Sequence, residues 1–261
     1  MNTPERQKRQ PLFHLLNILI VLLIIGGLYL ILYPYYVHWR QDSLTKDLQD
    51  AFNQGDGTIL IDPDALAVAG EDVDYGDLSE GGETTGSTAA GSETSSETTV
   101  NSGTQASSEP TPTVTPKPLP AKIVVKAIGQ IKIPVINLNM PIAEGATIYN
   151  LRVAISRYSN GAGIGQPGQC VLFGHRMYTY GRHFNRLDEV KAGDQIILED
   201  KANRYTYEVD LIETILPEEL ISHLNDQFEE SRILLVTCTP IRVASHRLLV
   251  KGKLVSTEPL G

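Results

Sequence analysis

An uncharged stretch near the N-terminus restricts the fold of this chain more than any other feature. No Asp, Glu, Lys or Arg occurs from Leu12 to Val37, and Ile18–Leu32 is apolar apart from two glycines and one tyrosine. A bilayer core of about 30 Å is crossed by a single helix of roughly 20 such residues. The sequence therefore predicts one membrane-spanning helix over residues 12–37.

The residues that flank this helix predict its orientation. Arg6, Lys8 and Arg9 precede it, and aromatic residues from Tyr29 to Trp39 cluster near its far end. Because basic flanks stay in the cytoplasm, we expect residues 1–11 to be cytoplasmic and the chain after the helix to be extracellular. A cleaved signal peptide is the alternative, but it needs a small-x-small site, which is absent after the apolar run. A single-pass anchor in the cell membrane is favoured.

Residues 79–120 have a composition that does not support a packed core. Ser, Thr, Gly and Glu dominate first, and five prolines follow from Pro110 to Pro120. Such segments bury too little apolar surface to offset their chain entropy, so a disordered linker is predicted. A flexible coil of about 50 residues spans on the order of 40 Å, and we expect it to act as a tether.

The charge of the chain is concentrated in the same region. Almost all of the formal net charge of −9 comes from residues 70–120, which contain nine acidic residues and one lysine. The remainder is nearly neutral and has no basic stretch of the kind that binds nucleic acid. We therefore expect no nucleic-acid partner.

Residues 38–78 form a juxtamembrane segment, and residues 121–261 have the pattern of a folded domain. In the juxtamembrane segment, apolar residues at helical spacing predict a short helix over Asp42–Gln54. In the domain, short β-type runs separated by Gly and Pro predict a mainly β fold, closed or nearly closed into a barrel. The expected strands are Ile123–Val125, Gln130–Ile133, Val135–Met140, and a hairpin of Gln195–Glu199 with Arg204–Leu211, followed by helical turns within Glu218–Phe228.

Three chemically reactive residues lie at the ends of apolar runs in this domain. Cys238 follows Ile233–Val236, His175 follows the run that ends at Phe173, and Arg247 opens the last run. A thiol nucleophile, an imidazole that exchanges a proton and a permanent positive charge are the groups that acyl transfer requires.

The sequence around these residues resembles the sortase family, the membrane-anchored cysteine transpeptidases of Gram-positive bacteria. The matching motifs are FGHR at Phe173–Arg176, LVTCTP at Leu235–Pro240 and HRLLVKG at His246–Gly252, within a resemblance that covers Ile128–Val255. The resemblance implies a sortase-type eight-stranded β-barrel with short helices. It also implies catalytic roles for His175, Cys238 and Arg247. We expect no cofactor, and because the sequence has no Cys-x-x-Cys pair we expect no structural zinc site.

The same resemblance implies the reaction and its partners. Sortases cleave a sorting signal similar to Leu-Pro-x-Thr-Gly, form a thioester on the cysteine and transfer the acyl group to an amine. The motifs at Leu235–Pro240 and His246–Gly252 look like the pilin-polymerising class C, whose acceptor is a pilin lysine. The segment Tyr178–Val190 looks more like the class D or housekeeping type, which uses a peptidoglycan amine. Both acceptors remain open, with pilus assembly slightly favoured.

The same residues have other interpretations, both as individual groups and as the site of another class of protein. Arg176 and Arg242 compete with Arg247 for the charge-stabilising role, and His183 and His246 are expected to be solvated neighbours. Papain-like wall peptidases place Cys before His, and the unrelated wall transpeptidases carry Gly-Cys-x-Arg, so both are disfavoured. A non-catalytic, membrane-tethered binding module is the alternative from another functional class.

Two further features have structural interpretations. Cys170 lies too far along its strand from His175 to bridge Cys238 if those two are neighbours, so it is expected to be a buried filler rather than half of a disulfide. Asp62-Pro63 resembles the start of the lid found in many pilus-class sortases, but Asp64 stands where that lid has an aromatic residue. An ordinary turn is the favoured interpretation of this dipeptide.

Overall fold

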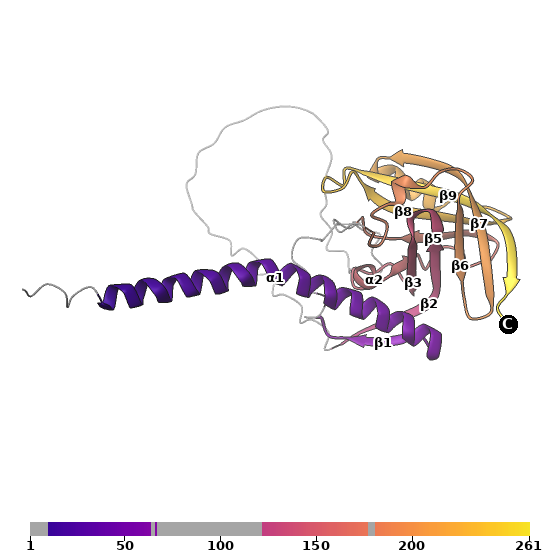
Figure 1. Cartoon of the computed structure of the whole chain (residues 1–261). Coiled ribbons are helices and arrows are strands. Elements are labelled where there is room, and N and C mark those ends of the chain that lie inside the picture. The colour runs from indigo at the N-terminus through magenta and orange to yellow at the C-terminus, as the bar shows by residue number, and fades with distance from the viewer. Residues whose placement is uncertain (1–9, 64–65, 67–121, 177–180) are drawn as a thin grey trace, which may run out of the picture.

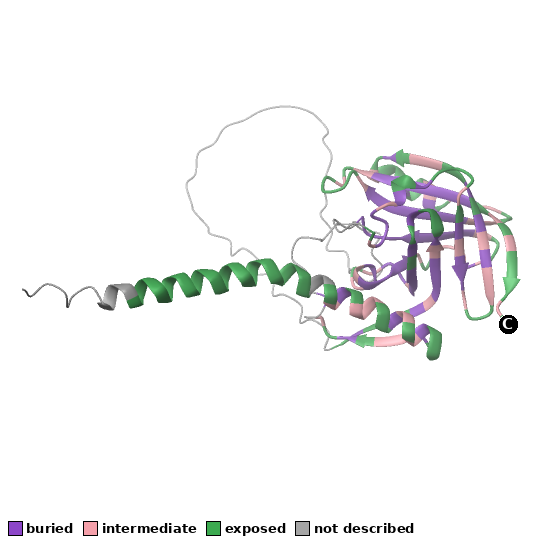
Figure 2. Ribbon diagram, in the orientation of Figure 1, coloured by how far each residue is buried: buried purple, intermediate pink, exposed green. Residues whose placement is uncertain are grey.

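The computed structural model describes residues 10–63, 66, 122–176 and 181–261. Its most extended element is helix α1, Gln10–Gln54, which includes Pro34 and joins the apolar run to the helix expected over 42–54 without a break. Residues 14–36 of α1, which project from the rest of the molecule, are exposed (Figure 2). By length and composition this helix is able to cross a membrane.

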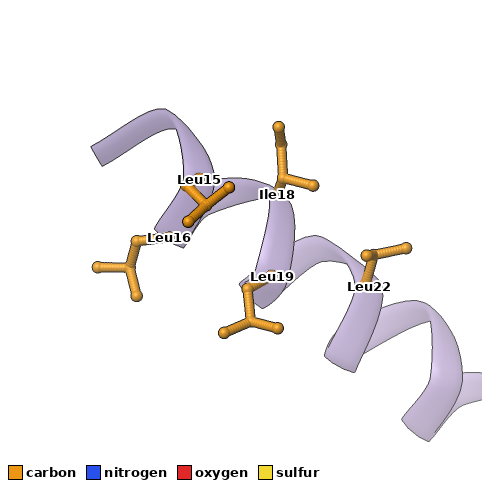
Figure 3. Close-up of a pocket in the computed structure, with 5 residues that line it drawn as sticks. All are labelled: Leu15, Leu16, Ile18, Leu19 and Leu22. Carbon is orange, nitrogen blue, oxygen red and sulfur yellow. The ribbon is translucent and has the colours of Figure 1, made fainter. Parts of the chain in front are cut away.

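A hollow on the surface of α1 is lined only by apolar side chains. Leu15, Leu16, Ile18, Leu19 and Leu22 surround it, and all five project from the same helix (Figure 3). Because one helix walls the hollow on one side only, these side chains form part of an exposed apolar surface rather than an enclosed ligand site. Such a surface suits contact with lipid.

Eight strands form a closed ring that confirms the predicted barrel. They follow one another in the order β2-β3-β4-β5-β8-β9-β7-β6, and β6 pairs back with β2 (Figure 1). Most neighbours are antiparallel, but β3–β4 and β5–β8 are parallel. The strands are β2 Ile123–Ile133, β3 Leu138–Glu144, β4 Ile155–Arg157, β5 Gly168–Phe173, β6 Gln195–Glu199, β7 Asn203–Ile215, β8 Ser231–Thr239 and β9 His246–Pro259.

Some predicted strand limits differ from the observed ones. Ile123–Val125 and Gln130–Ile133 belong to one strand, β2, and Val135 lies in a 3-10 turn, η3 (Pro134–Ile136), before β3 begins. Strand β8 continues through Cys238 to Thr239, instead of stopping before the thiol. The helical turns expected near Glu218 are η5 (Pro217–Glu219) and α3 (Leu220–Leu224).

The two faces of the ring are covered by different apolar clusters. The barrel interior contains Ile233 and Leu235 of β8, together with Leu172 of β5. The alternate residues Leu234 and Val236 belong to a second cluster outside the ring, which includes Leu220 and Leu224 of α3. This alternation follows from the two-residue period of a strand, and it determines the face to which each later residue of β8 belongs.

A third cluster joins the N-terminal segment to the barrel. Leu48 and Phe52 of α1 are buried against Ile123 and Val125 of β2, and Ile61 of β1 (Thr58–Ile61) lies in the same cluster. Strand β1 extends the sheet by antiparallel pairing with β2, in which Ile61 lies opposite Ile123. The half of α1 beyond Gln41 is therefore part of the packed unit.

This packing changes the interpretation of the low-complexity segment. The chain leaves the packed unit after Ile61 and returns to it at Ile123, and these two residues are partners across β1 and β2. The segment between them thus closes a loop on a single unit, whereas we had expected a tether between two. Residues 79–120 themselves lie outside the described residues, so their disorder stays a prediction.

Candidate active site

Strand register brings the three candidate residues side by side. Cys238 of β8 lies directly opposite Arg247 of β9. On the other side of β8, Phe173 of β5 pairs with Val236, and the amide of Gly174 donates to the carbonyl of Val236 at 3.1 Å. Two residues further along the same parallel alignment come His175 and Cys238, and neighbouring strands lie about 4.8 Å apart.

The three residues also share one face of the ring. Cys238 has the same parity as Leu234 and Val236 and belongs to the outer cluster. His175 has the parity of Phe173, and Arg247 has the parity of Leu249, both of which are in that cluster. The thiol and the guanidinium therefore lie outside the barrel interior, at the end where β5 and β8 finish and β9 begins, and His175 lies two residues past β5 at this same end.

All three side chains are largely screened from solvent. Cys238 is 2% exposed, His175 is 6% exposed and Arg247 is 7% exposed. The hydroxyl of Thr237 donates to the carbonyl of Gly174 at 2.8 Å, which ties the end of β8 to the residue before His175. Such burial strengthens electrostatic interactions between the groups, because little water is present to screen them.

The guanidinium of Arg247 is oriented by the loop that joins β8 to β9. Its Nη1 donates to the carbonyls of Ala244 and His246, at 3.1 and 3.2 Å. The loop itself is a tight turn, in which the amides of Val243 and Ala244 donate to the carbonyl of Pro240. A buried cation held this way is preorganised next to the thiol, rather than recruited from solvent.

The two competing arginines have other positions. Arg176 is buried, donates to Oγ1 of Thr239 at 2.7 Å and pairs with Asp188 at 2.8 Å. Its charge is therefore offset by a carboxylate, and its side chain links the end of β8 to η4 (Leu187–Glu189). Arg242 lies exposed on the loop between β8 and β9. This geometry favours Arg247 over both.

The expectation for His183 is wrong, because this residue is buried rather than solvated. It is 1% exposed, its ring lies edge-on to that of His175 with centroids 6.4 Å apart, and among the described residues neither ring nitrogen has a hydrogen-bond partner. Burial, and then the charge of His175, lower the pKa of His183 well below its ordinary value. His246, in contrast, is partly exposed and contacts the hydroxyl of Ser245 at 2.9 Å.

The second cysteine occupies the barrel interior, as expected for a buried filler. Cys170 belongs to the inner cluster, and its partner on β8 is Ile233, five positions before Cys238 and on the opposite face. Cys170 and Cys238 are not joined in a disulfide. Burial raises the pKa of the Cys170 thiol to about 12, so this residue stays protonated at neutral pH.

Contacts between α1 and distant parts of the domain had no signal in the sequence. Arg182 binds Gln41 and Asp42, and the hydroxyl of Thr45 donates to the carbonyl of Val153 at 2.9 Å. More than 100 residues separate the partners in each case, and neither side carries a motif. Within the described ranges no cluster of His, Cys, Asp and Glu could hold a metal ion.

Comparison with known proteins agrees with this geometry. Residues 131–255, which include His175, Cys238 and Arg247, match the family model of the sortase domain. The protein of Bacillus subtilis (strain 168) named sortase YwpE is 30% identical to this chain over 90 residues. The match covers 86% of YwpE and 34% of this chain. The chain belongs to the sortase family.

Other sortases match over about half of the chain. Sortase A of Bacillus anthracis is 30% identical over 51% of this chain and 62% of its own length, and sortase D of Bacillus subtilis is 32% identical over 50% and 65%. The chain thus spans less than two thirds of these curated relatives. Among solved structures, sortase C1 from Streptococcus agalactiae is 36% identical, with a TM-score of 0.47 and coverage of 50% of this chain and 68% of that chain.

Proposed function

We propose that this sortase is a cysteine transpeptidase, anchored in the cell membrane by residues 12–37 with its catalytic domain extracellular. It would cleave a sorting signal similar to Leu-Pro-x-Thr-Gly and transfer the acyl group to an amine. The observation that supports this proposal is the strand register, which pairs Cys238 with Arg247 and leads from the Phe173–Val236 pair to His175 two residues on, with all three residues buried. A binding module would have no need of this set of groups in one place.

The first half-reaction forms a thioester. The sulfur of Cys238 attacks the threonine carbonyl of the sorting signal, a C–S bond forms, and the C–N bond to the following glycine breaks. His175 gives a proton to the departing amine. Negative charge develops on the carbonyl oxygen, and the nearby guanidinium of Arg247 stabilises it, an interaction worth roughly 3 to 4 kcal/mol when a single donor is removed.

The second half-reaction uses an amine in place of water. The amine attacks the thioester, His175 accepts its proton, a new amide forms and the sulfur of Cys238 leaves. Arg247 again stabilises the carbonyl oxygen. The low exposure of Cys238 and His175 supports amine transfer over hydrolysis, because a screened thioester meets less water.

The acceptor is proposed to be a pilin lysine, as the motifs around Cys238 and Arg247 favour. A peptidoglycan stem or cross-bridge amine is the second candidate, supported by the segment Tyr178–Val190 and by relatives named sortase A and sortase D. Asp62 and Pro63 directly follow β1, at the end of the sheet occupied by α1, which supports a turn rather than a lid over Cys238.

One experiment tests the function and distinguishes the acceptors. The full chain in detergent is incubated with sorting-signal peptides and with either a pilin domain or a wall-stem peptide, and the products are identified by mass. The expected result is an acyl-enzyme on Cys238, followed by one amide product, and neither is formed by Cys238→Ala. Iodoacetamide should modify Cys238 at neutral pH and leave Cys170 unmodified, because the pKa of Cys170 is raised to about 12.

Transfer activity that survives in a folded Cys238→Ala variant would contradict the proposal. The same is true of modification at Cys170 with none at Cys238. Cys170→Ala is the matched control for the thiol substitution, since it removes the other cysteine from the barrel interior. It should preserve the chemistry while lowering stability through the cavity that it leaves.

A further inference from the structure

A buried polar contact joins α1 to the loop that follows His175. Nη1 of Arg182 donates to Oε1 of Gln41 at 2.8 Å, and Nη2 of Arg182 lies 3.0 Å from Oδ1 of Asp42. Gln41 is 2% exposed and the side chain of Arg182 is 11% exposed, whereas that of Asp42 is 65% exposed. The charge-assisted hydrogen bond to buried Gln41 therefore holds the two segments most firmly, and the ion pair with the exposed carboxylate of Asp42 adds less.

The segment that begins at Arg182 leads directly back to His175. The amide of Phe184 donates to the carbonyl of His175 at 3.0 Å, and the amide of Asn185 donates to the carbonyl of Arg182 at the same distance. Between them, the ring of His183 packs edge-on against the ring of His175. Residues 182–185 therefore form one wall of the space in which the His175 imidazole sits.

This wall is held in a conformation that it would not adopt alone. His183 has φ of +44°, in the left-handed region that residues other than glycine rarely occupy. Its ring is buried, and among the described residues neither ring nitrogen is hydrogen bonded, so exposure to water would satisfy it. Both features favour opening of the loop, and the contact of Arg182 with α1 opposes it.

We propose that Arg182 is a positioning residue, which fastens the loop of His183 to the stem of α1 and thereby orients His175. Gln41 and Asp42 are its partners, so the helix that carries the apolar anchor also sets the geometry of the site. The inference rests on the proposed function, in which His175 transfers the proton. It adds a role for α1 beyond membrane attachment.

The test compares Arg182→Gln with Arg204→Gln in the full chain in detergent micelles. Arg204 is a matched control, because it also pairs with carboxylates but lies in the hairpin of β6 and β7. We expect Arg182→Gln to lower kcat about tenfold or more with KM changed less than about twofold, and Arg204→Gln to leave both unchanged. Arg182→Lys, which keeps the charge facing Asp42, should recover part of the loss.

Coupling through Asp42 gives a second expectation. Asp42→Asn alone should lower kcat, and in the Arg182→Gln background it should have little further effect, because the interaction is already absent. Fully additive losses would contradict a direct link between these two residues. An unchanged kcat in Arg182→Gln, or a fall matched by Arg204→Gln, would overturn the proposal.

A readout that does not depend on catalysis separates this inference from the proposed function. Amide exchange at Phe184, whose N–H is bonded to His175, should become at least about tenfold faster in Arg182→Gln and stay unchanged in Arg204→Gln. Unchanged exchange overturns the positioning role even if the enzyme is active. If Arg182→Gln speeds exchange at Phe184 but the wild-type chain forms no acyl-enzyme, the positioning role stands and the transpeptidase function is contradicted.

Discussion

Neighbours, rather than burial, distinguish the residues around the thiol. Cys238 and Cys170 are both buried, yet they lie on opposite faces of the ring, and it is Cys238 that lies opposite Arg247. Arg176 and Arg247 are likewise both buried, but Arg176 is paired with Asp188. The chemical role of each residue is therefore decided by its neighbours rather than by its type.

The buried imidazole of His183 predicts a specific pH dependence of stability. Burial lowers the pKa of His183 well below the ordinary 6.5. As the pH falls below 6.5, His183 therefore binds a proton in the unfolded chain before it does so in the folded chain. The folded state thus loses stability as the pH falls below 6.5. His183→Phe should remove this contribution. Urea unfolding at pH 7.5 and 5.0 measures it.

Comparing the wild-type chain with His183→Phe isolates the contribution of His183, because the carboxylates titrate alike in both. The wild-type chain should lose more stability than His183→Phe over this pH interval. Equal losses would mean that the imidazole of His183 is protonated in the folded state. A variant that is less stable at pH 7.5 does not affect the conclusion, since only the difference between the two pH values is used.

At the scale of elements, the second half of α1 acts as a core helix. Leu48 is fully buried against β2, and its truncation to Ala should lower the free energy of unfolding by about 2 to 5 kcal/mol. Leu60→Ala is the control, because Leu60 of β1 is 62% exposed and its truncation should change stability by no more than about 0.5 kcal/mol. Urea unfolding of the full chain measures both.

Similar losses of stability in Leu48→Ala and Leu60→Ala would contradict the packing of α1 against the barrel.

The packing of α1 also affects how stable a truncated protein would be. A fragment that begins at residue 121 lacks β1 and the buried residues Leu48 and Phe52. It leaves Ile123 and Val125 of β2 uncovered, and we expect it to be less stable than the full chain.

At the scale of the whole molecule, the barrel is attached to α1 directly rather than through the low-complexity segment. A protease site placed within residues 79–120 and cut in membranes should leave the C-terminal fragment in the membrane fraction, because β1 and α1 still hold β2. Sedimentation with and without cleavage measures this. Urea, which disrupts the packing, should then release the fragment.

Release of the fragment by cleavage alone would show that residues 79–120 are the only connection, as for a flexible tether. The uncut chain is the first control, since it stays with the membrane in urea if α1 spans the bilayer. Leu48→Ala provides the second control. By weakening the cluster that holds α1 to β2, it should allow release of the cut fragment at a lower urea concentration.

Several features were predictable from local sequence. The limits of β6, the helix over 42–54 and the closed mainly β fold follow from periodicity and turn residues, which report local conformation. The candidate residues His175, Cys238 and Arg247 were found from motifs at the ends of apolar runs. The extension of β8 past Cys238 was missed, because Pro240 marks the end of a strand only to within a few residues.

The sequence by itself determined the long apolar helix, the mainly β domain and the candidate groups for acyl transfer. Only the tertiary structure decided that Cys238 shares one face with His175 and Arg247, that His183 is buried behind the imidazole, and that Gln41 and Asp42 bind Arg182. The reason is physical: periodicity and motifs describe neighbours along the chain. Contacts across β5, β8, β9 and α1 join residues far apart in sequence, and burial is set by what packs on top of them.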